Sequence, residues 1–186
     1  LLCGVKVYSK DYKALKPVSW LCEGYVTLIR GTPMTVQLLI IYYVIFGNVD
    51  IDKTLTAVLA FGINSGAYMA ELIRSGINAV DKGQMEAARS LGMSKAQAMA
   101  KIILPQAIKN ILPAIGNECI ALLKETSVAG YVAIVDVTRA AANIRNKTFD
   151  AVNPIILLAL VYLVMVVIMT YLLSILERRL RKSDGK

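Results

Sequence analysis

Charged and amide side chains lie within apolar stretches of this 186-residue chain. Ionisable groups inside apolar segments avoid lipid, so they either border a path for a polar solute or pair with one another structurally. The candidates for a solute path are Gln37, Asn64, Glu71, Lys124 and Glu125. All but Glu71 fall near mid-depth when positions are counted from the segment ends. The alternative is that Lys124 pairs with Glu118 or Glu125 and holds the helices together, and both interpretations stay open.

Catalytic chemistry has little support in the sequence. The chain has no histidine, which excludes His-based metal sites and Ser–His or Cys–His catalytic pairs. Cys3, Cys22 and Cys119 are far apart and form no paired motif, so we interpret them as small apolar core residues. The GxxxxGK[ST] phosphate loop is missing, so this chain is not expected to hydrolyse ATP. We therefore predict no enzyme, no metal site and no cofactor in this chain.

The composition indicates that lipid is the solvent. Hydrophobic residues make up 56% of the chain and the mean hydropathy is +0.57, whereas soluble domains are about 45–50% apolar. Four apolar segments, 25–46, 55–77, 112–134 and 154–176, are long enough to cross a bilayer of roughly 30 Å. We interpret residues 1–7 as the end of a further spanning helix that starts outside this sequence. The expected fold is all-α: residues 1–186 form one polytopic transmembrane bundle of about five spans, the first of them truncated.

The basic residues give this bundle an orientation. The chain holds 21 lysines and arginines and has a net charge of +8. Most of them fall in 6–16, 82–109 and 178–186, which lie on the same side if five spans alternate. The positive-inside rule makes that side, with the C-terminus, cytoplasmic. No stretch interleaves aromatic residues with Lys and Arg, so membrane lipid rather than nucleic acid is the expected partner. Segment 136–153 is then the longest outer segment, and we expect a polar loop there.

Segment 80–109 has the clearest local pattern of the cytoplasmic segments. Residues 84–91 are good helix formers, with Met85, Ala88 and Leu91 at helical spacing. Gly92 offers the left-handed backbone conformation that commonly ends a helix. The pattern therefore predicts one short helix and a glycine elbow.

A second short helix is predicted to follow the elbow. Ser94 and Gln97 form a capping-box pattern that begins it, and Pro105 limits or kinks it at its far end. We expect the two helices to form a rigid knob on which Ala87 and Ala88 leave a small-residue surface for another protein. The alternative is an amphipathic hairpin that lies in the lipid headgroup layer.

The same residues match a longer spaced pattern. Glu86-Ala87-Ala88, three residues, Gly92, nine residues and the sequence IILP at 102–105 resemble the EAA loop of bacterial ABC importer permeases at every defined position. Other stretches are similar to permeases for polar amino acids. They are RGTP at 30–33 followed by Gln37, NSGAY at 64–68 followed by Glu71 and Arg74, LPAIGNE at 112–118, and LKETS at 123–127. Together the resemblance covers about 25–176.

The resemblance implies the permease subunit of an ATP-dependent importer in the bacterial inner membrane, which translocates polar amino acids delivered by an extracytoplasmic binding protein. It implies that a dimer of separate ATPase subunits holds ATP and Mg²⁺. The coupling residues implied for docking on these ATPases are Glu86, Ala87, Ala88, Arg89 and Gly92. A second permease subunit, identical or related, would complete the path. An amino acid carries a carboxylate and an ammonium group, so Asn64, Lys124 and Glu125 are hypothesised to border that path.

Two other functions stay open. An ion-coupled secondary transporter or channel would explain the charged spans but not the spacing of the EAA pattern. An importer of a different small solute is disfavoured by the stretches similar to amino-acid permeases. A structural choice also stays open at Arg30, because Gly31 and Pro33 weaken the helix there and allow either a gating hinge or a plain entry kink.

Overall fold

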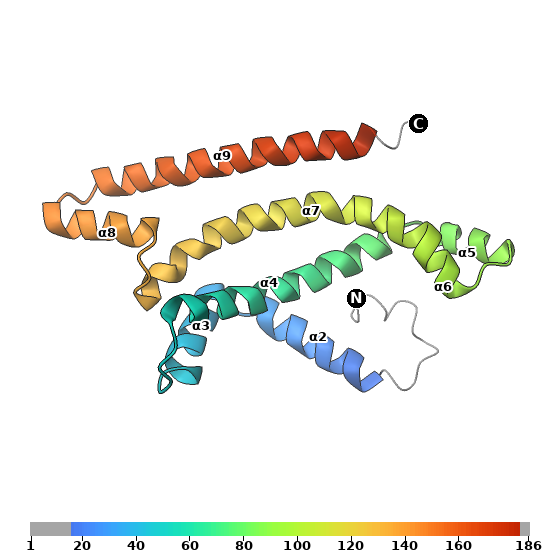
Figure 1. Ribbon diagram of the computed structural model, residues 1–186, viewed down its shortest axis with the longest axis horizontal. Helices are drawn as coiled ribbons and strands as arrows, with labels where there is room; N and C mark the ends of the chain where they lie inside the picture. The colour runs from blue at the N-terminus through green and yellow to red at the C-terminus, as the bar shows by residue number, and fades with distance from the viewer. Residues whose placement is uncertain (1–15, 183–186) are drawn as a thin grey trace. The chain divides into compact units, whose positions relative to one another are not determined.

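Helices make up the regular structure of this chain in the computed structural model, which describes residues 16–182 (Figure 1). No strand occurs within that range, so the predicted all-α fold is confirmed. In chain order the elements are α2 (Lys16–Arg30), α3 (Met34–Leu39), the π-helix η2 (Ile40–Ile45), α4 (Lys53–Asn78), α5 (Lys82–Ser90), α6 (Lys95–Ala98), the π-helix η3 (Met99–Ile103), α7 (Leu104–Glu125), the 3₁₀-helix η4 (Thr126–Val132), α8 (Val137–Thr148) and α9 (Asn153–Lys182).

The described chain divides into two compact units. Unit 1 comprises residues 16–30, 66–116 and 177–182, and unit 2 comprises 31–65 and 117–176. Helices α4, α7 and α9 contribute residues to both units. Each unit has its own buried core.

Two helices of the described range are long and apolar enough to cross a membrane, Lys53–Asn78 and Asn153–Arg178. They contain the predicted spans 55–77 and 154–176. The predicted span 112–134 falls on α7 and η4. Neither element is among the candidate spans of the described range, since polar and charged residues recur there and α7 ends at Glu125. The expected span at 1–7 lies outside the described residues. The count of five spans therefore stays a prediction.

The span predicted over 25–46 consists of two helices, and whether it crosses the membrane stays a prediction. Helix α2 ends at Arg30 and α3 begins at Met34, so Pro17–Arg30 and Met34–Ile45 form a broken span or a re-entrant loop. Pro33 causes the break because it has no N–H group to continue the ladder of α2. It is instead the N-cap of α3, with φ −64° and ψ 140°. The weakness predicted around Pro33 thus takes the form of a complete break.

The core of unit 2 joins three stretches that are far apart in the sequence. Leu38 and Ile41 of α3 and η2, Ala57 and Ala60 of α4, and Val132 of η4 are buried together. The two alanines leave no bulky side chain on that face of α4, so the neighbouring backbone can approach closely, as is usual between helices in membranes.

The core of unit 1 lies where α4 ends and α7 begins. Ile77 and Val80 pack against Ile103, Ala107 and Ile111, which lie on η3 and the first turns of α7. This cluster anchors segment 80–109 to two long helices by apolar contact.

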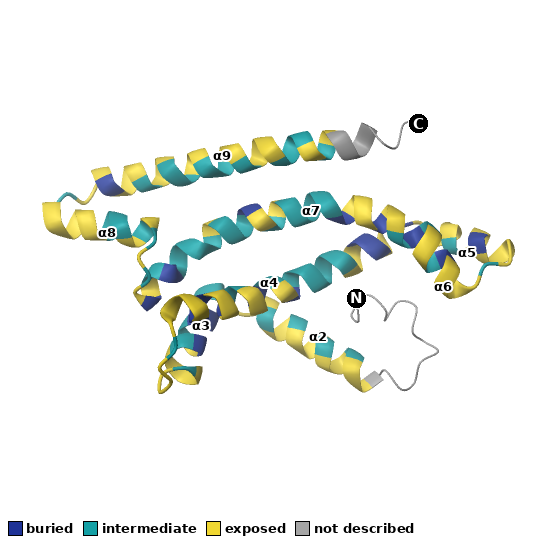
Figure 2. Cartoon of the chain, viewed as in Figure 1, coloured by how far each residue is buried: buried dark blue, intermediate teal, exposed yellow. Residues whose placement is uncertain are grey.

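Helix α9 differs from the other long helices in its exposure. None of its apolar membrane-span window is buried inside the chain, and Figure 2 shows exposed and intermediate residues along nearly all of its described length. A continuous apolar surface of this length must be covered by lipid or by another protein.

Candidate functional site

The candidate site begins with the two short helices between α4 and α7. We call α5, the connection 91–94, α6 and η3 the knob, which comprises residues 82–103 and lies within unit 1. Its first helix begins at Asp81, whose side chain accepts a hydrogen bond from the Gly83 N–H at 2.8 Å. This N-cap satisfies one of the backbone donors that a helix start leaves without an intrahelical partner.

The elbow of the knob is a Schellman motif. Gly92 has φ +86°, the left-handed region that a side chain with a Cβ adopts at a cost. The Met93 N–H donates to the Ala88 carbonyl at 3.1 Å, and the Gly92 N–H donates to the Arg89 carbonyl at 3.0 Å. These two bonds are the pair that defines the motif. A guanidinium N–H of Arg89 also donates to the Met93 carbonyl at 3.1 Å, which ties the turn to the end of α5. The predicted glycine elbow is confirmed.

The second helix of the knob begins with the predicted capping box. The Gln97 N–H donates to the Ser94 hydroxyl at 3.2 Å, and the Ser94 N–H donates to the Gln97 side-chain oxygen at 2.9 Å. Each residue's backbone N–H group is thus bonded to the other residue's side chain, so hydrogen bonds between near neighbours fix the first turn of α6.

Of the two outcomes predicted at Pro105, the limit is wrong, because α6 continues through η3 into α7, and the kink stays a prediction. Proline lacks an N–H and its ring crowds the preceding turn, and the wider π-helical turn of residues 99–103 directly precedes it. The side-chain amide of Gln106 donates to the Ile102 carbonyl at 2.9 Å. The knob is thus joined to α7 without a break.

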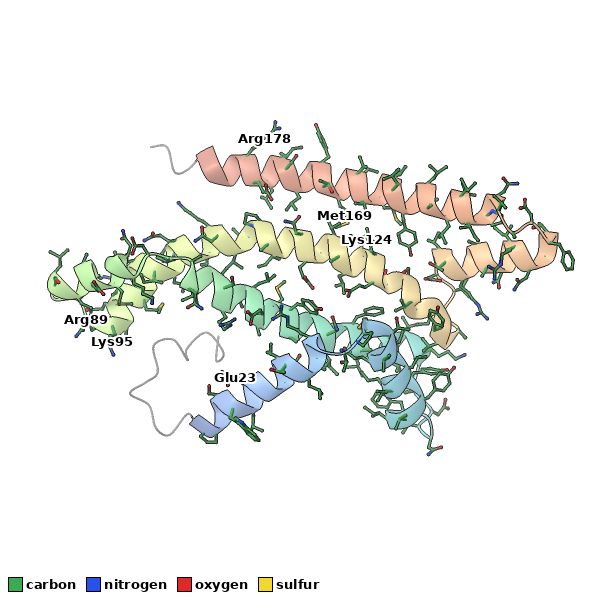
Figure 3. All side chains as sticks on the ribbon, turned by 180° about the vertical axis from the view of Figure 1, so that it is seen from behind. Glu23, Arg89, Lys95, Lys124, Met169 and Arg178 are labelled. Atoms are coloured by element: carbon green, nitrogen blue, oxygen red, sulfur yellow. The ribbon has the colours of Figure 1, made fainter. Side chains whose placement is uncertain are left out.

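The knob presents only part of the predicted coupling set at its surface. Glu86, Ala87, Arg89 and Gly92 are exposed, and Figure 3 places Arg89 and Lys95 at the same end of the knob. Ala88 is 4% exposed and therefore buried. The small-residue surface expected at Ala87 and Ala88 is wrong for Ala88, which packs inward because α5 and α6 meet there.

Leu91 is an exposed apolar residue of the knob. Its side chain is 85% exposed, although it stands at helical spacing from Met85, which is half-buried, and Ala88, which is buried. The reason is that Leu91 is the C-cap of α5 and has left the helical repeat. The adjacent Gly92 was the available signal for this departure, since a C′ glycine places the preceding residue at the cap.

Glu71, a predicted path residue, forms an ion-pair cluster in unit 1. Its carboxylate accepts hydrogen bonds from both Nε and Nη2 of Arg74, the first at 2.9 Å. Nη1 of Arg30 lies 3.6 Å from the same carboxylate, and the Arg30 guanidinium lies over the Tyr68 ring, 5.4 Å from its centroid. The carboxylate is thus shared by two guanidinium groups, one of which also makes a cation–π contact.

Gln37 and Asn64 form a buried amide pair in unit 2. The Asn64 side-chain N–H donates to the Gln37 side-chain oxygen at 3.0 Å. The Gln37 side-chain N–H groups bond to the Thr32 carbonyl at 3.0 Å and to the Thr32 hydroxyl at 2.7 Å. Both amides are buried, and the Asn64 side-chain oxygen has no hydrogen-bond partner within the described chain. Thr32 was not foreseen as a member of this network.

Lys124 and Glu125 lie at the end of α7, the last two residues before the 3₁₀-helix η4. The lysine is exposed and the glutamate is half-buried; Figure 3 labels Lys124. Within residues 16–182 Lys124 forms no ion pair with Glu118 or Glu125. The structural pairing considered for this lysine is therefore not made inside the described part of one chain.

The segment expected as a polar loop at 136–153 is mostly helical. Asp136 is the N-cap of α8, and its side chain accepts a hydrogen bond from the Arg139 N–H at 2.7 Å. The helix ends at Phe149, which has φ +57°. The expectation of a loop is wrong because the alanines at 140–142 and the Asp136 cap favour a helix.

Comparison with known proteins agrees with this architecture. Residues 4–182 match the model of the family described as "binding-protein-dependent transport system inner membrane component". The chain is similar to the arginine transport system permease protein ArtQ of Bacillus subtilis, with 39% identity over 186 residues, covering 99% of this chain and 85% of ArtQ. It is also similar to the L-cystine transport system permease protein TcyB of Bacillus subtilis, with 37% identity over 174 residues, covering 92% of this chain and 74% of TcyB.

A solved structure described as an amino acid ABC transporter with histidines resembles the fold. It shares 47% sequence identity with this chain and superimposes with a TM-score of 0.84, covering 96% of this chain and 84% of the matched one.

Proposed function

Because this chain belongs to the family of binding-protein-dependent transport system inner membrane components, we propose that it is the permease subunit of an ATP-driven importer of polar amino acids. The amino-acid class is supported by the relatives, whose names give arginine and L-cystine as their cargo. It is also supported by the similar structure, an amino acid ABC transporter. The family sets aside the ion-coupled secondary transporter or channel.

The observation that carries the proposal is the way the knob is built. Backbone hydrogen bonds fix its elbow at Gly92, and a capping box fixes the first turn of α6. Ile103 of the knob packs against the end of α4 and the start of α7. A stiff body with this attachment transmits a displacement to two long helices rather than absorbing it. We assign the knob to a separate ATPase dimer, which holds ATP and Mg²⁺ and moves the knob when it closes.

The docking surface of the knob combines charge and one apolar side chain. Glu86 and Arg89 provide opposite charges, and Leu91 provides an apolar contact beside Gly92. An exposed apolar residue ringed by polar ones is the usual form of an interface anchor. Ala88 then acts from inside, by allowing α5 to pack closely against α6.

Purification of the full-length protein together with candidate ATPases tests this assignment. We expect one ATPase to co-purify with the wild type and to be lost on Glu86→Lys and on Leu91→Asp. The matched control is Lys53→Glu, which reverses an exposed charge at the start of α4 and should leave the complex intact. Equal recovery of the ATPase with all four proteins would overturn the assignment.

Lys124 and Glu125 are the residues best placed to meet the solute. They supply a cation for the carboxylate of an amino acid and an anion for its ammonium group, and neither has a side-chain partner in the described chain. Gln37, Asn64 and Glu71 are satisfied largely by their own chain. We therefore assign solute contact to Lys124 and Glu125, and positioning of the helices to the other three.

Transport assays separate these two roles. Lys124→Gln and Glu125→Gln are expected to leave assembly with the ATPase unchanged and to lower uptake of the amino acid strongly. Lys53→Gln, which removes an exposed charge at the start of α4, is the control and should transport normally. Loss of assembly rather than of uptake would assign Lys124 and Glu125 to packing, against another subunit.

The remaining parts of the assembly follow from the same proposal. The basic run at the end of α9 supports a cytoplasmic C-terminus through the positive-inside rule, and in this proposal an extracytoplasmic binding protein delivers the solute to the opposite side. A second permease subunit, identical or related, covers part of the exposed apolar surface and closes the path.

A further inference from the structure

Helices α8 and α9 border a groove whose lining includes none of the residues that we assign to the solute path. The groove has a volume of about 400 Å³, which is within the range of small-ligand sites. Its apolar walls are formed by Ala140, Ala141 and Ile144 of α8 and by Leu157, Leu158 and Val161 of α9. Both walls belong to unit 2, and Figure 1 shows α8 lying beside the first part of α9.

The depth of the groove restricts what can occupy it. Val161 lies eight residues into α9, or about 12 Å along the helix. This part of α9 belongs to a helix that is long and apolar enough to cross a membrane, so we take the floor of the groove to lie at the depth of the hydrocarbon region. A water-soluble protein does not reach that depth, and an apolar chain does.

The rim of the groove is positively charged. Helix α8 contains no acidic residue and three cations: Arg145 and Lys147 lie in its last turn, at the rim, and Arg139 lies near its start, where the adjacent Thr138 hydroxyl is 3.4 Å from that of Tyr162. Within the described chain, none of these three side chains forms an ion pair or a hydrogen bond. Arg145 follows Ala141 by four residues and Lys147 follows Ile144 by three, so the two cations flank the groove face of the helix.

Asp150 is the single acid at the rim, and its carboxylate is already engaged. It accepts hydrogen bonds from the N–H groups of Val152 at 3.0 Å and Asn153 at 3.2 Å, and from the Asn153 side chain at 2.6 Å. These bonds, that of the Asn153 side chain first, lower the pKa of Asp150. The carboxylate therefore caps α9, and the two cations on α8 stay available to a ligand.

We propose that an anionic phospholipid of the outer leaflet occupies this groove. One acyl chain lies between α8 and α9, and the phosphate headgroup is held by Arg145 and Lys147. An apolar slot below a cationic rim matches the two parts of such a lipid. A second copy of the chain that met the groove with its own α8 would bring three more positive charges to the same place, which disfavours it.

A photo-crosslinking experiment identifies the occupant directly. Ile144→p-benzoylphenylalanine is introduced into the full-length protein, the membranes are irradiated, and the adduct is identified by mass spectrometry. We expect an adduct with the mass of a phospholipid. An adduct with a second copy or with the binding protein, and no lipid adduct, would overturn the proposal.

Matched variants test whether the groove and its charges select the lipid. The purified transporter is analysed by native mass spectrometry after exchange into vesicles of phosphatidylglycerol and phosphatidylcholine. We expect Ala141→Trp, which fills the groove, to lower retained phosphatidylglycerol about tenfold. Asn146→Trp, on an exposed face of α8 outside the groove, should retain it.

The same assay tests whether the positive charges of Arg145 and Lys147 select an anionic lipid. The double variant Arg145→Gln/Lys147→Gln is expected to lose the preference for phosphatidylglycerol over phosphatidylcholine, and Lys53→Gln is expected to keep it. Both cations are exposed, so their removal should not prevent folding. Equal lipid retention by all variants would contradict the site, and the result is independent of whether amino acids are transported.

Discussion

The knob of unit 1 and the amide pair of unit 2 are held in different ways. In the knob, a Schellman turn at Gly92 and a capping box at Ser94 connect residues that are neighbours in the sequence. In unit 2, Asn64 bonds to Gln37 across 27 residues of chain. The knob can therefore keep its internal shape while it moves as a body, whereas the amide pair persists only while α3 and α4 stay packed. The knob is therefore suited to transmit motion, whereas the hydrogen bond between Gln37 and Asn64 depends on how α3 and α4 are arranged.

The largest effect is expected where the knob is anchored. Ile103→Ala removes a side chain that is 1% exposed in the core of unit 1, and lost burial together with the cavity should cost about 2–5 kcal/mol. Ile108→Ala, at an exposed position of α7, is the control and should cost little. Thermal unfolding of the purified protein measures both. If Ile103→Ala were as stable as Ile108→Ala, the knob would not depend on that core.

Two glycines of α4 sharpen the comparison of the units. A Cβ at Gly76 would overlap the side chain of Ile111, which lies in the core of unit 1, whereas a Cβ at Gly62 in unit 2 meets no atom within 4 Å. We expect Gly76→Ala to destabilise by about 1–3 kcal/mol through overpacking. Gly62→Ala should stabilise by roughly 0.5–1 kcal/mol, because alanine is the better helix former. Melting curves that shift in the same direction would contradict this assignment.

The amide pair predicts an asymmetry between its two members. Gln37→Leu leaves both polar atoms of the buried Asn64 side chain without partners, since its oxygen already has none in the described chain. Asn64→Leu removes both polar atoms of that buried side chain, while the side-chain N–H groups of Gln37 keep their bonds to Thr32. We expect Gln37→Leu to cost about 1–3 kcal/mol and Asn64→Leu less. The double variant should cost less than the sum of the two, and additive losses in the unfolding measurement would show that the amides do not act together.

The smallest effect concerns pH and the cap of α4. The N–H groups of Leu55 and Thr54 donate to the Asp52 carboxylate at 3.0 and 2.8 Å, and these bonds lower its pKa. A carboxyl whose pKa is lower in the folded state stabilises the protein above its ordinary pKa of about 3.9 and loses that contribution as the pH falls through the folded value. The melting temperature of Asp52→Asn should therefore fall less than that of the wild type between pH 5 and 3, as acid titration of both proteins would show. If the melting temperatures of the two proteins fell in parallel as the pH was lowered, the stabilising role of the Asp52 carboxylate would be contradicted.

The sequence predicts best those features that rest on short-range backbone chemistry. The elbow at Gly92 and the capping box at Ser94 are built from residues at most five positions apart, and both were predicted. The long apolar helices α4 and α9 were predicted as well, since their length and composition are sufficient. The helical fold class needs no further information.

Features that depend on the packing of distant residues could not be predicted from short-range sequence signals. Ala88 was expected on an exposed small-residue surface, but the meeting of α5 and α6 buries it, and Leu91 is exposed because α5 ends there. Thr32 carries no signal of its own, and it becomes part of the amide network because the break at Pro33 places it beside Gln37. Pro105 was expected to limit or kink a helix; a π-helical turn precedes it and the helix continues, so it does not end there.

The central claim is that the knob touches an ATPase and passes its motion to the membrane helices. Leu91→Cys in a background without other cysteines, treated with a short bifunctional thiol reagent in the assembled transporter, tests this most directly. We predict a covalent product with the ATPase whose yield changes when ATP is added, and no such product from Ile155→Cys on the exposed apolar surface of α9. A Leu91→Cys protein that forms no product with the ATPase, while the same transporter imports its solute normally, would contradict the account.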